Sequence, residues 1–262
     1  MSQLPTIFVS HGAPDLPLRP SLAREFLLGL GQQIEQPTAI LVVSAHWNTG
    51  SPQVSAATSP ATIHDFTGFP AELYRLTYPA PGAPQLAKRV NTLLTAAGFD
   101  SEVVPGRGLD HGAWNPLLLI YPAADIPVTQ LSIQPQRDAA YHLRLGQAIA
   151  PLRDEGVLIL ASGSTTHNLW ELGRQADETP PVWVSDFVEW LTAKLLAGDT
   201  EALVNYRQLA PFAERNHPSP EHLLPIFVAL GASGVGTRGS ALHNSYTYGV
   251  LSMAAFSFPA LA

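Results

Sequence analysis

Cysteine is absent from this chain of 262 residues. Its absence excludes disulfides, thiol nucleophiles, iron–sulfur clusters and every zinc site with cysteine ligands. A metal ion would therefore have to be held by histidine, aspartate or glutamate side chains. The chain contains nine histidines, and these are the first residues to consider for chemistry.

Charged residues and long apolar runs are also scarce. Charged residues make up 13% of the chain and hydrophobic residues 46%, whereas a typical globular protein has roughly 25% charged residues. This balance supplies a core and excludes a disordered chain.

The net charge of -7, without any block of Lys or Arg, argues against a nucleic-acid partner. No apolar run reaches the ~18 residues of a membrane span, and no signal-peptide pattern opens the sequence, so we expect a cytoplasmic protein without a membrane partner.

Apolar runs of strand length alternate with segments of helix-like composition. The runs resemble buried strands of a mostly parallel sheet, and they are Thr6–Ser10, Ala39–Ala45, Val128–Ile133 and Val157–Ala161. Helices are expected at Ser21–Glu35, Ala83–Ala97, Asp138–Leu152 and Val182–Leu196, and around His222–Leu230. This alternation predicts an α/β fold, a three-layer αβα sandwich around a mostly parallel or mixed central sheet that Val250–Phe258 closes as a late strand. No polar linker divides the chain, so residues 1–262 are expected to form a single domain. The sequence does not specify how many copies of the chain associate.

Three histidines lie close to the ends of predicted strands. His11 directly follows the first strand, His46 directly follows the second, and His167 comes a short turn after Val157–Ala161. Ligands of open α/β sheets bind at the carboxyl ends of the strands. If these strands are parallel neighbours, the three imidazoles face one crevice.

His222 is expected at a helix entrance. Ser219 suits an N-cap and Pro220 the first helical position, which would place His222 in the first turn. Pro225 complicates this start, because proline removes an early helical hydrogen bond. Taken alone, the segment is as typical of a capping or turn histidine as of a ligand.

His111 stands between Asp110 and Gly112, a pattern that suits a tight turn. A surface turn and a catalytic residue are both compatible with that pattern. No function is assigned to the remaining histidines, which are His64, His142, His217 and His243.

Taken together, an ordered set of short strings resembles the DODA-type extradiol ring-cleaving dioxygenases, the 4,5-DOPA dioxygenase branch of the LigB superfamily. The strings run in the order of that family over most of the chain. They are Ser10–Pro14, Val42–Trp47, Thr62–Pro70, Tyr78–Gly82, Leu109–Trp114, Gln130–Ile133, Ala161–Gly163 with His167–Leu169, and Pro220–Pro225. One departure is Ala13, where the family often has serine.

The resemblance implies a role for each of five histidines. His11, His46 and His222 would be the metal ligands. His167 would lie beside the metal, either as a fourth ligand in the resting state or as the general base. His111 would lie on the substrate side of the pocket, where it would hydrogen-bond the substrate or oxygen and act as an acid.

The resemblance also implies the reaction and its cofactor. The substrates would be O2 and a catechol, with L-DOPA and 4,5-cleavage as the candidate. Activity would need Fe(II), because zinc has no redox role, although a neutral site of three imidazoles also suits Zn(II). Aromatic side chains that could stack on the catechol ring are Trp47, Phe66, Phe69, Tyr74 and Trp114.

Two other functions remain open from the residues. A zinc-dependent hydrolase could use the same histidines to activate water. A non-enzymatic Memo-like binding protein could keep the fold of the superfamily without its chemistry. The presence of all five pocket histidines argues against the second of these.

Overall fold

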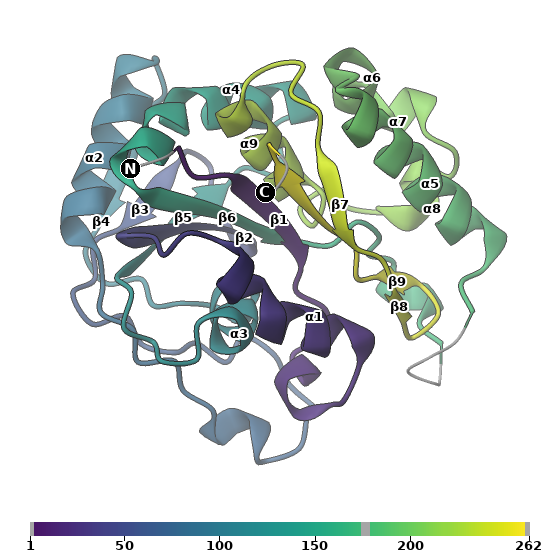
Figure 1. Cartoon of the computed structure of the whole chain (residues 1–262), viewed down its shortest axis with the longest axis horizontal. Coiled ribbons are helices and arrows are strands. Elements are labelled where there is room, and N and C mark those ends of the chain that lie inside the picture. Colours follow the sequence, from purple (N-terminus) through teal and green to yellow (C-terminus); the bar gives the residue numbers. More distant parts are fainter. Residues whose placement is uncertain (1–2, 174–178, 260–262) are drawn as a thin grey trace.

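The computed structural model describes residues 3–173 and 179–259, and its centre is an eight-stranded mixed sheet (Figure 1). The strands lie in the order β4 (Glu102–Val104), β3 (Gln53–Ser55), β5 (Val128–Ile133), β2 (Ala39–Asn48), β6 (Val157–Gly163), β1 (Thr6–Ser10), β10 (Ala255–Phe258) and β7 (Ser240–His243). The central strands β5, β2, β6 and β1 pair in parallel. The predicted α/β fold with a mixed central sheet is therefore confirmed.

Antiparallel pairs occur on both sides of the parallel centre, and β4 at one edge pairs with β3 in parallel. β3 is antiparallel to β5, and at the opposite edge β10 is antiparallel to β1 and β7 to β10. The single late strand predicted over Val250–Phe258 is wrong, because the segment is interrupted between Leu251–Ser252 (β9) and β10. β9 pairs with Tyr246–Thr247 (β8) in a separate small sheet, which directs its backbone hydrogen bonds away from β1.

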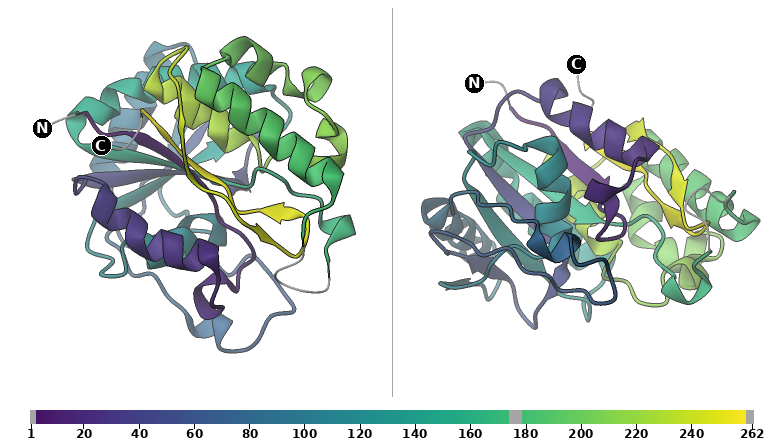
Figure 2. Two further views of the ribbon diagram at one scale, coloured as in Figure 1. Left: turned by 45° about the vertical axis from the view of Figure 1, so that its right-hand side comes forward. Right: turned by 90° about the horizontal axis from the view of Figure 1, so that it is seen from below.

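Helices cover both faces of the sheet (Figures 1 and 2). One layer contains α2 (Pro84–Ala96), α4 (Ala139–Ile149) and α9 (Leu224–Ser233), and the other contains α1 (Leu22–Leu30) and α3 (His111–Ile120). Side chains of successive strand residues point to opposite faces. In β2, Leu41 and Val43 therefore pack with the first layer, while Ile40 and Val42 pack with the second.

The remaining α-helices lie together on one side of this sandwich, next to β7 (Figure 1). They are α5 (Val182–Ala197), α6 (Thr200–Val204), α7 (Tyr206–Leu209) and α8 (Ala213–Asn216). The chain also forms 3₁₀ turns at Leu16–Leu18, Gly31–Gln33, Leu73–Arg75, Ala150–Glu155 and Leu169–Glu171. The predicted first helix was too long, because α1 ends at Leu30 and the chain continues as a 3₁₀ turn. Within the described part of the chain, no helix has the length and apolar character needed to cross a membrane.

Helix α3 replaces the tight turn expected around His111. Asp110 is the N-cap, and its carboxylate accepts a hydrogen bond from the Ala113 N–H at 3.2 Å. An aspartate in this position satisfies one of the free N–H groups at a helix start. His111 is therefore the first residue of a buried helix rather than part of a surface turn.

Two other element boundaries near the histidines also differ from expectation. The predicted strand end at Ala45 is wrong, because β2 continues to Asn48 and carries His46 within it. The predicted helix start at Pro220 is also wrong, because α9 begins at Leu224 with proline in its first turn. Proline is tolerated there because the first N–H groups of a helix have no intrahelical partner. His222 consequently lies in the turn that precedes α9.

Candidate active site

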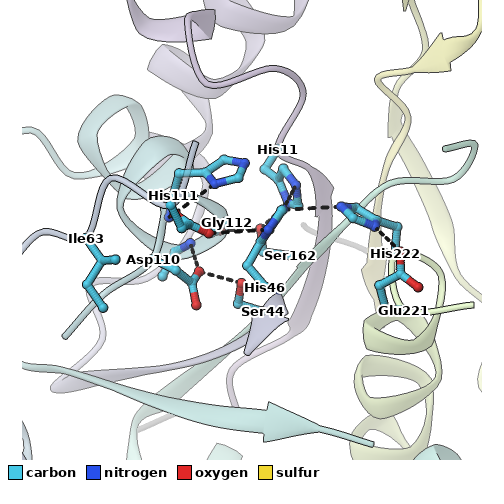
Figure 3. A network of polar contacts seen from close by, with 12 residues as sticks. His11, Ser44, His46, Ile63, Asp110, His111, Gly112, Ser162, Glu221 and His222 are labelled. Carbon is cyan, nitrogen blue, oxygen red and sulfur yellow. Dashed lines mark hydrogen bonds and ion pairs between the residues drawn. The ribbon is translucent and has the colours of Figure 1, made fainter. Parts of the chain in front are cut away.

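Three histidines from different parts of the chain bring their Nε2 atoms together (Figure 3). Nε2 of His46 lies 3.1 Å from Nε2 of His11 and 3.2 Å from Nε2 of His222. His11 directly follows β1, His46 lies near the end of β2, and both strands flank β6. The sheet and the turn before α9 thus place three imidazoles around one point.

The other nitrogen of each imidazole faces a hydrogen-bond acceptor. Nδ1 of His11 lies 3.0 Å from the Ser162 hydroxyl, and Nδ1 of His222 lies 3.0 Å from the Glu221 carboxylate. Nδ1 of His46 faces the Asp65 carboxylate at 3.4 Å. An ionised carboxylate only accepts hydrogen bonds, so these contacts place the imidazole hydrogen on Nδ1. The lone pairs of the three Nε2 atoms then face one another.

This donor set fits a single metal ion. Lone pairs that face one another at about 3 Å repel, and a cation between them converts the repulsion into attraction. Zinc binds imidazole nitrogens at about 2.0–2.1 Å, which places nitrogens around one ion roughly 3–3.4 Å apart, as observed between His46 and its two neighbours. Hydrogen bonds from the far nitrogen to a carboxylate or hydroxyl are the usual support of a metal-binding histidine.

Burial keeps the three imidazoles neutral. Desolvation lowers the pKa of His11 and of His222 well below 6.5, and neighbouring histidines lower it further. Desolvation also lowers the pKa of His46 to about 3, with the Asp65 carboxylate acting in the opposite direction. Metals bind the neutral imidazole, so the fold holds all three in the form that a metal requires.

The orientation of His11 depends on a proline inside helix α3. Pro116 has no N–H, so the carbonyl of Gly112, four residues earlier, lacks its usual helical partner. The Ser162 hydroxyl donates its hydrogen to that carbonyl. The Ser162 oxygen is thereby turned to accept from Nδ1 of His11, which leaves Nε2 of His11 directed at the cluster.

A buried carboxylate ties the start of α3 to β2. Asp110 is fully buried and accepts hydrogen bonds from Ser44 at 2.6 Å, from Arg107 at 3.0 Å and from Gln130. The Ser44 oxygen also accepts from the backbone N–H of His46 at 3.1 Å.

The close approach of these two elements explains the glycine at position 112. A Cβ on Gly112 would lie 2.4 Å from the Ser44 hydroxyl and 3.0 Å from the His46 ring. Only glycine therefore lets α3 approach β2 at this distance.

His111 lies against His46 and is bound to Asp65. The ring centroids of His46 and His111 are 3.9 Å apart. One oxygen of Asp65 accepts from both the backbone N–H and Nδ1 of His111, at 2.9 and 3.0 Å. Desolvation raises the pKa of Asp65, but the hydrogen bonds and charge of His111 outweigh it and lower this pKa to about 2. Asp65 is therefore an ionised acceptor bonded to His111, and it lies within ion-pair distance of His46.

His167 lies beside the cluster rather than within it. Its ring stacks on His222 with centroids 3.3 Å apart and an interplanar angle of 10°. Its ring nitrogen forms a group close enough to share an ion with Glu221 and His222, not with His11 and His46. Desolvation lowers the pKa of His167 to about 4, so this imidazole is also neutral at physiological pH.

A cavity of about 350 Å³ opens beside these histidines. Its polar lining includes His11, His46, Asp65, His111 and His167, and its apolar lining includes Phe66, Phe69, Leu169, Leu172 and Leu251. Of the aromatic residues expected to face a substrate, Phe66 and Phe69 line the cavity. Trp114 is instead a buried helix residue whose Nε1 donates to the Ile63 carbonyl at 2.9 Å.

Sequence reasoning did not identify the partners of the histidines. Asp65 and Glu221 each lie next to a histidine in the sequence, within the strings Thr62–Pro70 and Pro220–Pro225. An acidic residue beside a histidine in such a string was the available signal. Ser162 had no comparable signal, because its role depends on the missing N–H of Pro116.

Comparisons with known proteins identify the family of the chain. The family described as the catalytic LigB subunit of aromatic ring-opening dioxygenase matches residues 23–257. A relative named 4,5-DOPA dioxygenase extradiol, from Beta vulgaris, is 44% identical over 97% of this chain and 96% of its own length. A relative of the same name from Escherichia coli (strain K12) is 42% identical over 88% of this chain and 86% of its own length.

A solved structure also shares the fold. The crystal structure of an uncharacterized protein from Escherichia coli K12 has a TM-score of 0.80 and 34% sequence identity, and the match covers 97% of this chain and 99% of that one. The family match spans most of the chain and the relatives are similar over nearly their whole length. The chain therefore belongs to the LigB family of aromatic ring-opening dioxygenases, and it is an extradiol ring-cleaving enzyme of that family.

Proposed function

We propose that this enzyme opens the ring of a catechol beside its diol, with O2 as the second substrate. The observation that carries the proposal is the convergence of the Nε2 lone pairs of His11, His46 and His222 at the side of a cavity that phenylalanines line. L-DOPA, cleaved at the 4,5 position, is the first catechol to test, because the relatives from Beta vulgaris and Escherichia coli are named for it.

The metal we propose for activity is Fe(II), held by His11, His46 and His222. Neutral imidazoles accept Fe(II) as well as Zn(II), but zinc has no redox chemistry. When bound, iron supplies the one-electron chemistry that lets a catechol react with O2. The residues of the chain then have to bind the catechol ring and transfer the protons of its hydroxyl groups.

The ring is seated by the segment that follows His64. Phe66 and Phe69 line the cavity and contact each other edge to face, with centroids 5.4 Å apart. Aromatic pairs of this geometry favour a further ring in offset or edge contact. Leu169 and Leu172 add apolar side chains to the same lining.

His167 is the residue we propose to take a proton from the catechol. It is neutral, lines the cavity and stacks on a proposed ligand without joining the three converging nitrogens. These features support the role of base over that of a fourth ligand. General bases of this kind contribute about 10²–10⁴-fold to rate.

His111 is the residue we propose to contact the substrate oxygen where negative charge develops. Its Nδ1 hydrogen is bound to Asp65, so it reaches an oxygen through Nε2, and it donates there only as the imidazolium, with a second hydrogen on Nε2. A preorganised group at such a position acts mainly in the transition state. This placement supports its proposed part as hydrogen-bond donor and acid.

The proposal is tested with metal-free protein reconstituted under nitrogen. Protein loaded with one equivalent of Fe(II) and then given L-DOPA and O2 should form a yellow ring-cleavage product while consuming O2 and catechol in equal amounts. The matched Zn(II)-loaded protein should do neither. Ester or amide hydrolysis by the zinc form, without ring cleavage by the iron form, would support a hydrolase instead.

A further inference from the structure

The Asp65 carboxylate lies between two histidines that have different proposed tasks. One oxygen accepts from the backbone N–H of His111 at 2.9 Å and from its Nδ1 at 3.0 Å. The other oxygen lies 3.4 Å from Nδ1 of His46. A single side chain therefore contacts both a proposed metal ligand and the residue proposed to contact substrate.

The segment that carries Asp65 is anchored to the residues that precede α3. The Ile63 N–H donates to the Leu109 carbonyl and the Leu109 N–H donates to the Ala61 carbonyl, both at 2.8 Å. Trp114 of α3 donates to the Ile63 carbonyl from the other side. The backbone two residues before Asp65 is thus fixed against the start of α3 by contacts other than those of Asp65 itself.

We propose that Asp65 is a positioning residue that sets the tautomer and the relative orientation of His46 and His111 together. An ionised carboxylate accepts but does not donate, so each imidazole presents its Nδ1 hydrogen to Asp65 and its Nε2 atom away from it. This inference rests on the proposed function, which makes His46 a ligand and His111 a substrate-side group. It goes further by assigning to Asp65 the fixed geometry between the metal and the group that acts on the substrate.

The substitution Asp65→Asn separates this role from simple packing. An amide has nearly the same shape, but it offers one acceptor and one donor group where the carboxylate offers two acceptors. Whichever way the amide turns, its NH2 group meets a hydrogen on one of the two histidines. One imidazole must then change its tautomer or move.

Glu221→Gln is the matched control. Glu221 accepts from Nδ1 of His222 at 3.0 Å and from the Ser219 hydroxyl at 2.9 Å. It supports one proposed ligand, as Asp65 does, but no hydrogen bond joins it to His111 among the described residues. Both variants therefore disturb one metal ligand, and only Asp65→Asn also disturbs His111.

Three measurements on the full chain, besides a check that the variants are folded, test the inference. Zinc affinity, measured by competition with a chelator, should fall about 10–100-fold in both variants. With iron and substrate saturating, kcat of Asp65→Asn should fall at least ~10-fold more than kcat of Glu221→Gln, consistent with the loss of a positioned general acid. Melting temperatures of the metal-free proteins show whether both variants are folded.

The third measurement needs neither metal nor substrate. Nitrogen-15 NMR of the metal-free protein at pH 8 should show His46 and His111 with their hydrogens on Nδ1, and Asp65→Asn should shift the signal of one of these two histidines towards the other tautomer. Unchanged signals of both histidines in Asp65→Asn, or equal kcat losses in the two variants, would overturn the inference. If the wild type opens no catechol, the proposed function fails, while the NMR result still decides the role of Asp65.

Discussion

Two buried histidines, His142 and His222, show how the same side chain serves structure in one place and chemistry in another. Both are almost fully buried, and desolvation lowers the pKa of both. In His142 each nitrogen has a backbone partner, because Nδ1 donates to the Asp138 carbonyl at 2.8 Å and Nε2 accepts from the Gln134 N–H at 3.2 Å. In His222 only Nδ1 has a hydrogen-bond partner outside the histidine cluster, the Glu221 side-chain carboxylate at 3.0 Å, while Nε2 faces another Nε2 at 3.2 Å.

The difference lies in which hydrogen-bonding groups are satisfied within the fold. A buried polar group without a partner costs roughly 1–3 kcal/mol. The fold therefore tolerates converging lone pairs only where a ligand compensates for them. Burial and pKa do not distinguish the two histidines, but the partner of the second nitrogen does. The predictions below test this distinction.

The largest effect is expected from His222→Ala. Removing one of three imidazoles should weaken metal binding by about 10²–10³-fold, because binding energies of roughly 10–16 kcal/mol are shared among a few ligands. Metal analysis after dialysis would measure this loss, and ring cleavage should disappear with the metal. His142→Ala is the control and should retain one metal per chain. Loss of metal from both variants would show that general destabilisation, not ligation, is responsible.

A large effect on rate alone is expected from His167→Gln. This variant should retain its metal but lose about 10²–10⁴-fold in kcat, because a general base is removed. Metal content and steady-state rate would be measured on the same preparation. If the metal content of His167→Gln falls together with kcat, His167 is a metal ligand, and the metal would have four imidazole ligands.

His111→Ala should lower kcat by about 10²-fold while metal content and catechol affinity stay close to those of the wild type. The reason is that a group acting on developing charge stabilises the transition state more than the bound substrate. A catechol titration of the metal-loaded variant, together with its steady-state rate, would separate the two effects. If His111→Ala turns over at the wild-type rate, His111 has no catalytic role and is only the first residue of α3, bound to Asp65.

A smaller effect, confined to stability, is expected from His142→Ala. The substitution leaves the buried Gln134 N–H without its acceptor and creates a cavity, which together should cost about 2–3 kcal/mol of unfolding free energy. Urea unfolding at pH 7 would measure this. A change below about 0.5 kcal/mol would mean that the backbone partners of His142 are satisfied in another way.

The smallest effect concerns pH. Burial lowers the pKa of folded His142 to about 4 from the usual 6.5, so in this range the unfolded chain binds a proton that the folded chain does not. The unfolding free energy should therefore fall as pH decreases from 6.5 towards 4, by up to about 1.4 kcal/mol per pH unit for each such histidine. Urea unfolding of metal-free protein at pH 7 and 5.5 should show this loss, and His142→Ala should show a shallower one. An unchanged slope in the variant would contradict the assignment.

The central strands were predictable from composition, whereas the edge strands and α3 were not. Strands buried on both faces, such as β2 and β6, form continuous apolar runs that are visible in one sequence. β3 has only the residues Gln53–Ser55 and lies in a proline-rich connection. Helix α3 contains both Gly112 and Pro116, which have the lowest helix propensities. It forms because Asp110 caps it and its apolar residues are buried against β2.

The sequence by itself determined the α/β layering and the residue types that a metal site must use. Buried strands need continuous apolar runs, and a chain without cysteine leaves histidine, aspartate and glutamate as the side chains that can hold a metal ion. Only the tertiary structure decided which lone pairs meet. Asp65, His111 and His46 are distant in sequence, and nothing local specifies that one carboxylate contacts both imidazoles. That contact follows from the pairing of the segment around Ile63 with Leu109 and from the approach of α3 to β2 at Gly112, because packing between distant segments, not local propensity, sets the direction of each hydrogen bond.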